Sequence, residues 1–210
     1  MKKIMMLMIT AIIAMPVAFS QNKALTKAEQ KEYKTKMKEF KKEGWKLFAS
    51  SRSLDVALLQ HYEQLNNAKG EAYEIVGTAS KFQSKNVGHQ TAINNACNIY
   101  ARQAGSKIKG RIVSDLASDG VDPSSEFDHF YAAYESLVEK EIKGEMKESF
   151  SVIRENKDGT YEMQTYFIIN ESAATKARIR AYENAAKESE AAQKYAQKVS
   201  DFVREGFRPE

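Results

Sequence analysis

The chain has 210 residues, a net charge of +4 and a single cysteine. Its 32 basic and 28 acidic residues nearly balance. This argues against a nucleic-acid-binding protein, which needs a concentrated basic surface. One cysteine excludes an internal disulfide. With three prolines, ten glycines and no low-complexity tract, the composition indicates a compact domain with a substantial core.

Residues 1–20 have the pattern of a secretory signal peptide. Two lysines precede an apolar run over residues 4–14, and small residues stand where signal peptidase cleaves. The run is too short to cross a bilayer, so we expect cleavage after Ser20. Gln21 then stands where a lipoprotein carries its anchor cysteine. We therefore expect a periplasmic or secreted protein with no transmembrane segment and no lipid anchor in the mature chain.

Residues 21–43 are predicted to contain a basic N-terminal helix. Thr26 and Glu29 have the spacing of a capping box, in which each side chain satisfies a free amide of the other residue. Such a helix can lie on an anionic membrane or partner. The glutamates between the lysines favour the alternative, a solvated helix held by ion pairs along its length: Glu29, Glu32, Glu39 and Glu43. We expect the solvated, ion-paired form.

Residues 44–210 are predicted to form one domain, which begins with two strands and two helices. Alternating residues over 45–48 indicate a short strand, and Ser51 or Ser53 can cap the helix that follows. Residues 71–83 read as a long strand whose small residues around Gly77 suit a closely packed helix. Alanines and isoleucines at every fourth position predict a helix over 89–116.

The second half of the domain is predicted to contain a helix, a hairpin and a last helix. Asp122 and Pro123 are typical of a helix start, and apolar residues then follow a helical stripe to Ile142. Strands from 146 to 152 and 161 to 169 flank a turn at 156–159. One continuous helix is expected over 171–207, capped by Asn170. Its charged far half is expected to project past the sheet or pack on the N-terminal helix.

The order of these elements predicts the fold class. Strands and helices do not alternate regularly, which favours an α+β fold over a doubly wound one. We expect an antiparallel sheet of three or four strands with the long, alanine-rich helices packed on one face.

The segment from Tyr73 to Ile112 resembles a known family. A strand of sequence YEIVGTAS is followed by alanines and isoleucines at helical spacing: Ala92, Ala96, Ala101, Ala104, Ile108 and Ile112. This is similar to the strand-then-helix core of the LPP-twenty-type envelope lipoproteins and of the N-terminal domain of the flagellar assembly factor FlgT. Gly44-Trp45-Lys46 also resembles uncharacterised secreted proteins of the Bacteroidetes type. The resemblance implies an envelope structural or interaction module and supplies no catalytic residues.

The residues that could carry chemistry do not form a recognisable motif. His61, His89 and His129 lie on three separate segments without the paired spacing of zinc ligands. Cys97 lies in the alanine-rich helix, where a free cysteine is commonly a small buried hydrophobe. A nucleophilic pair of Cys97 with His89 or His129 is a less favoured alternative.

Three other patterns have simple structural explanations. Asp115, Asp119 and Asp122 with Gly120 lack the spacing of a calcium loop and are explained by a helix end followed by a new cap. The glycosylation sequon at Asn170 is explained as a helix cap. Four aromatic residues could line a ligand pocket between their helix and the sheet, although helical spacing favours a core: Phe127, Phe130, Tyr131 and Tyr134.

These observations favour a non-enzymatic envelope protein that acts as a structural or interaction module. The expected partner is another envelope protein or a second copy, bound through a sheet edge or the basic N-terminal helix. The alternative is a carrier of an apolar small molecule in a cavity between helices and sheet, and an enzyme is the third hypothesis. No catalytic residue, cofactor or metal ligand is predicted.

Overall fold

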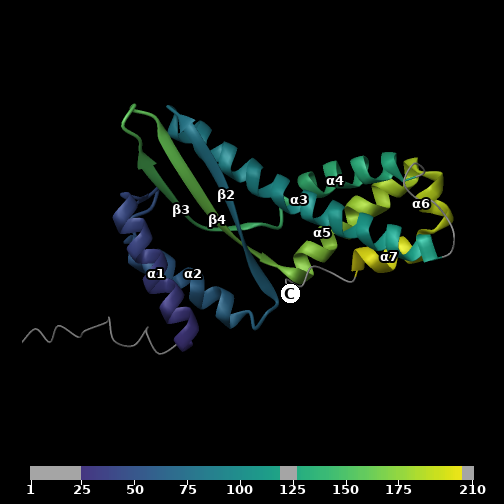
Figure 1. The fold of residues 1–210 in the computed structure, drawn as a ribbon, viewed down its shortest axis with the longest axis horizontal. Helices are drawn as coiled ribbons and strands as arrows, with labels where there is room; N and C mark the ends of the chain where they lie inside the picture. Colours follow the sequence, from purple (N-terminus) through teal and green to yellow (C-terminus); the bar gives the residue numbers. More distant parts are fainter. Residues whose placement is uncertain (1–24, 119–126, 205–210) are drawn as a thin grey trace, which may run out of the picture.

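The computed structural model describes residues 25–118 and 127–204, which form an antiparallel sheet with helices on both faces (Figure 1). The predicted α+β fold is confirmed. The elements are α1 (Lys27–Glu43), β1 (Lys46–Leu47), α2 (Leu54–Asn67), β2 (Ala72–Phe82), α3 (Lys85–Ser118), α4 (Asp128–Ile142), β3 (Lys147–Glu155), β4 (Tyr161–Asn170), α5 (Glu171–Ala185), α6 (Glu190–Lys194) and α7 (Ala196–Arg204).

The sheet has four strands in the order β1-β3-β4-β2, and every neighbouring pair is antiparallel. The predicted hairpin is confirmed: β3 and β4 pair along their length, with Val152 opposite Gln164. Its turn is closed by the Asn156 amide, which donates to the Thr160 carbonyl at 2.8 Å, and Gly159 supplies the positive φ of 79°. β2 adds to the far side of β4, so it is an outer strand.

The first half of α3 lies directly on one face of the sheet. Gly77 of β2 is so close to α3 that an added Cβ would lie 1.9 Å from the Ala92 carbonyl oxygen and 2.9 Å from the Ala96 Cβ. Only small residues permit this approach, which is why the strand and the helix both carry them here. The predicted contact between an alanine-lined helix and the small face of the strand is confirmed.

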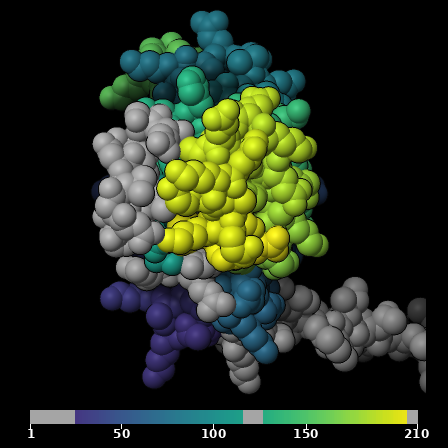
Figure 2. Space-filling view, turned by 90° about the vertical axis from the view of Figure 1, so that its right-hand side faces the viewer, coloured from purple at the N-terminus to yellow at the C-terminus, as the bar shows by residue number. Residues whose placement is uncertain are grey.

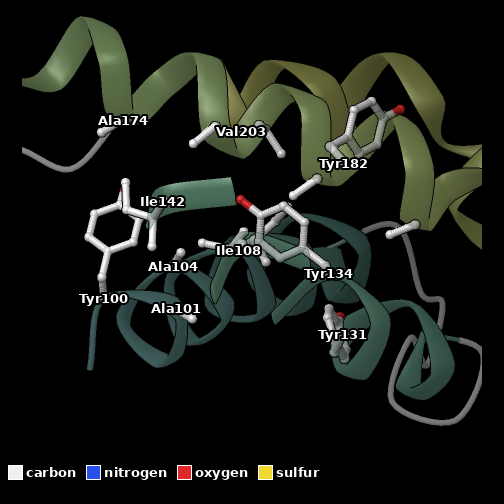
Figure 3. Packing of buried hydrophobic residues seen from close by; sticks show 14 of the residues in the cluster. Tyr100, Ala101, Ala104, Ile108, Tyr131, Tyr134, Ile142, Ala174, Tyr182 and Val203 are labelled. Atoms are coloured by element: carbon white, nitrogen blue, oxygen red, sulfur yellow. The ribbon is translucent and has the colours of Figure 1, made fainter. Parts of the chain in front are cut away.

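The second half of α3 runs past the sheet and packs against α4 and α7 (Figure 1). In Figure 3, Ile108 and Tyr134 lie between α3 and the C-terminal helices that carry Tyr182 and Val203. The four aromatic residues considered for a pocket lie in this helical core, where Phe127, Phe130 and Tyr134 are at most 1% exposed. The favoured interpretation of these residues as core is confirmed. The less favoured pocket between α4 and the sheet is not supported, because α4 packs on α3 and α5.

The opposite face of the sheet is covered by α1 and α2, which form a second, smaller core with it. The Phe40 ring packs edge-on against Phe150 at 6.4 Å and Tyr166 at 6.0 Å. Tyr166 is 3% exposed, and its neighbours Thr165 and Phe167, which point to the other face of the sheet, are also buried. Strand β4 therefore has cores on both sides, which the alternation of its sequence did not reveal.

The single helix predicted over 171–207 is wrong. After Ala185 the chain forms a short 3₁₀ turn, becomes extended at Ser189, and continues as α6 and α7. The Ser189 side chain caps α6 by accepting from the Ala192 amide at 3.1 Å. This break turns α7 back onto α5 and α3, so that Val199 and Val203 become buried. Figure 2 shows these helices closing this end of the molecule.

Several predictions fall outside the described residues. These are the signal peptide over 1–20, the helix start at Asp122 and Pro123, and the positions Asp119 and Gly120. Within the ranges 25–118 and 127–204, no helix combines the length and apolar character that a membrane crossing requires.

Candidate interaction surface on the first helix

Helix α1 carries six exposed lysines on one face. They recur at steps of three, four or one residue, which place them within about 100° around the helix axis: Lys27, Lys31, Lys34, Lys38, Lys41 and Lys42. We call this set the lysine face. It extends about 22 Å along the helix. Within the described part of the chain, no ion pair involves any of these six lysines.

The glutamates of α1 are occupied elsewhere or turned away from the lysine face. Glu29 accepts from the Thr26 amide at 2.7 Å and completes the predicted capping box. Glu39 pairs with Lys36 at 3.1 Å, and Glu43 pairs with Arg154 of β3 at 2.9 Å. The prediction of a helix held by ion pairs along its length is therefore wrong for the lysine face. Charges that alternate in the sequence are separated on the helix surface.

Contacts on the other side of α1 fix the direction in which the lysine face points. Met37 and Phe40 are buried against the sheet and α2. The Tyr33 hydroxyl donates to Asp55 of α2, and burial raises the pKa of that tyrosine above its usual value. These contacts hold the apolar side of α1 inward, so the lysines face outward.

The C-terminal end of α1 is fixed by an ionic contact with the sheet. Gly44 ends the helix with a φ of 77°, and Trp45 then turns inward. The Arg154 guanidinium lies 4.7 Å from the Trp45 ring centre and bonds to both Glu43 and Glu162. Contacts on its apolar side and at its C-terminal end therefore fix both the position and the orientation of α1.

The two outer edges of the sheet, the other predicted contact surface, carry features that hinder strand addition. On β2, the Asn95 side chain donates to the Thr78 carbonyl at 2.7 Å, and the register shifts between Ala79 and Phe82. On β3, the short β1 covers part of the edge, and Arg52 donates to the Ser149 carbonyl at 3.1 Å. Covered and bulged edges discourage pairing with another chain.

The structure does not bring the three histidines together. His61 is fully buried, with its Nε2 atom 2.5 Å from Glu74 and its ring between Tyr62, Phe150 and Tyr166. His61 is therefore a packing residue. His129 is exposed on α4. Among residues 25–118 and 127–204, no cluster of three or more His, Cys, Asp or Glu side chains could hold a metal ion.

His89 belongs to a hydrogen-bonded chain that joins α3 to the hairpin. Its Nε2 atom lies 3.0 Å from Glu148, and the Ser151 hydroxyl donates to the same carboxylate at 2.6 Å. A catalytic triad needs the imidazole between the nucleophile and the acid. Here the acid lies in the middle and Ser151 is 2% exposed, so this arrangement is structural.

Cys97 is buried, and its sulfur lies 3.7 Å from the Met146 sulfur. Burial raises the pKa of its thiol, which disfavours the nucleophilic thiolate. His89 precedes it by eight residues on the same helix, a separation of about 12 Å. The interpretation of Cys97 as a small buried hydrophobe is confirmed.

A buried arginine in the helical core was missed by the sequence analysis. The Arg178 guanidinium donates to Glu171 and to the Tyr100 hydroxyl, both at 2.6 Å, and to Thr175 at 2.7 Å. Burial opposes the charged form, but Tyr100 and Glu171 outweigh it and raise the pKa of Arg178. The sequence does hold a signal of this burial, because Arg178 follows Ala174 by four residues and so lies in the apolar stripe of α5.

Comparisons with known proteins add no relative. A scan of family models, a search of curated proteins and a search of solved structures each returned no match to this chain.

Proposed function

We propose that this chain is an exported, non-enzymatic protein of the cell envelope that acts as an interaction module. Its contact surface is the lysine face of α1. The observation that carries the proposal is the set of six exposed lysines, unpaired within the described residues, on a helix whose other side is anchored in the core. Export is supported by the signal-peptide pattern of residues 1–20.

The lysine face is suited to recognise negative charge. Lysine ammonium groups are compact charges on flexible stems, which attract anions without requiring one fixed geometry. Because the face is held outward, binding needs no rearrangement of the fold. The chemistry of the partner is therefore that of an anionic surface.

The alternative, a carrier with a cavity between the helices and the sheet, has less support. Gly77 and Ala92 are in direct contact there, and the aromatic rings of α4 are packed against each other, with Phe130 and Tyr134 stacked at 5.7 Å. The resemblance of Tyr73–Ile112 to envelope proteins agrees with the proposal and itself stays a prediction.

Export predicts a specific mature N-terminus. When the full chain is produced in a bacterium with a secretory pathway, the protein recovered from the periplasm or medium is expected to begin at Gln21. Intact-mass spectrometry of the fractionated protein checks this. A chain found only in the cytoplasm with residues 1–20 retained contradicts export.

Charge neutralisation tests the lysine face directly. Replacing Lys27, Lys31, Lys34 and Lys38 by glutamine is expected to lower retention on a sulfopropyl cation-exchange resin at least about tenfold at a fixed salt concentration. Elution volumes in isocratic runs measure the effect.

The control for this experiment has the same net charge. It replaces four exposed lysines that are scattered over other elements: Lys69, Lys147, Lys157 and Lys176. Retention of the control close to that of the wild type supports the proposal. Equal losses for both variants would show that retention depends on net charge alone, and the lysine face would then have no special role.

A further inference from the structure

We infer that the partner of the lysine face is the headgroup layer of an anionic phospholipid bilayer. This inference rests on the proposed function and narrows it. The shape of the face, the residues that flank it and the residue types it lacks all favour such a partner.

The lysine face belongs to one helix, and the hollow between its lysine side chains is open to solvent. The six lysines form one strip about 22 Å long. A flat surface touches a helix along one strip only, so this strip fits a plane of regularly spaced charges. The apolar side of α1 is buried, with Phe40 fully inaccessible and Met37 6% exposed. Attachment is therefore electrostatic and peripheral, and no part of α1 enters the hydrocarbon layer.

A folded protein partner is disfavoured by the composition of the face. Stable protein interfaces depend on aromatic or arginine anchors that fill pockets, and lysine is depleted in them. The strip contains no arginine and no aromatic residue. The nearest aromatic side chains of α1, Tyr33 and Phe40, are directed toward α2 and the sheet.

Nucleic acid is disfavoured by the acidic residues beside the lysine face. Glu32, Glu39 and Glu43 lie on the flank that follows it around the helix. A helix inserted in the major groove is surrounded by phosphates on both flanks, so these carboxylates would be repelled. On a flat bilayer the same carboxylates point sideways and stay in water.

The expected strength follows from the number of lysines. Each lysine close to an anionic leaflet raises the binding constant about fivefold, so six predict a partition constant on the order of 10⁴ M⁻¹. Such binding is measurable at millimolar lipid. It weakens as salt shortens the screening length from about 8 Å at physiological ionic strength to about 3 Å at 1 M.

The experiment uses sedimentation with sucrose-loaded vesicles. Mature protein is mixed with vesicles of phosphatidylglycerol and phosphatidylcholine, or of phosphatidylcholine alone, at low salt. We expect binding to the anionic vesicles only, reversal by 1 M NaCl, and about 600-fold weaker binding for the four-lysine glutamine variant. The control variant with glutamine at Lys69, Lys147, Lys157 and Lys176 should bind within about fivefold of the wild type.

Two further measurements make each outcome decisive. The fluorescence of Trp45, the single tryptophan, which is buried, reports whether each variant is folded. Competition between the vesicles and a short DNA duplex tests nucleic acid as the alternative anionic partner. Resin retention through the lysine face without vesicle binding overturns the lipid inference and leaves the proposed function standing. Tighter, face-dependent binding to the duplex than to vesicles also overturns it. Loss of face dependence on the resin overturns the proposed function itself.

Discussion

Replacing Gly77 by alanine is expected to destabilise the protein by about 3 kcal/mol. The added Cβ would lie 1.9 Å from the Ala92 carbonyl oxygen, which belongs to the backbone of α3 and cannot rotate away. Helix α3 also carries much of the helical core, including Ile108 and Ile112. A shift of the helix at Gly77 therefore disturbs packing beyond the sheet. Urea unfolding followed by circular dichroism measures the change.

Gly110, which lies on α3, provides the control for this substitution. It is exposed, and an added Cβ there meets no atom within 4 Å. Alanine has the higher helix propensity, so Gly110→Ala is expected to stabilise the protein by up to about 1 kcal/mol. Opposite signs for the two substitutions would establish that the close contact with α3 decides the effect at Gly77. Wild-type stability in Gly77→Ala would contradict the close packing of α3 on β2.

Removal of the Arg178 side chain is the second change with a large expected effect. Arg178→Ala should lower the free energy of unfolding by about 3–5 kcal/mol, because it leaves the Glu171 carboxylate without its buried cation. The side chain of Arg178 is 3% exposed and that of Glu171 is 15% exposed, so water replaces the lost bonds poorly. Chemical unfolding at neutral pH is the measurement.

Arg180 is the control for this prediction. It lies two residues away on α5 and also bonds to two carboxylates, Glu141 at 2.5 Å and Glu145 at 2.8 Å, but its side chain is 42% exposed. Exposed ion pairs contribute little, so Arg180→Ala is expected to cost less than about 1 kcal/mol. Similar costs for the two alanine variants would contradict the importance of burial at Arg178.

Burial thus distinguishes the charge of Arg178 from the charges of the lysine face. Arg178 is enclosed and joins α5 to the Tyr100 hydroxyl of α3 and the Val203 carbonyl of α7. The lysine face is exposed and makes no ion pair within the described residues. The first arrangement stabilises the fold, and the second is available to bind.

Local sequence patterns predicted most of the individual elements. The capping box of Thr26 and Glu29, the cap at Ser53 and the cap at Asn170 all form as expected. Each depends on residues within one turn of a helix, so no distant contact is needed. The hairpin was predictable for the same reason, since its turn and its alternation are adjacent in the chain.

The break after Ala185 could not be predicted from local pattern. Residues 186–190 contain no proline or glycine and have good helix propensity. The helix ends there because turning back lets Val199 and Val203 enter the core and lets Arg178 bond to the Val203 carbonyl. Tertiary packing outweighs a propensity of a few tenths of a kcal/mol per residue.

By itself, the sequence determined the α+β class, the order of the elements and the small residues that bring α3 onto β2, because these follow from short-range periodicity and capping. Only the tertiary structure decided that α1 and α2 cover the second face of the sheet, that Arg178 is buried, and that the lysines of α1 are left unpaired among the described residues. Those outcomes depend on which surfaces meet, and contacts between distant segments such as Glu43 with Arg154 set them.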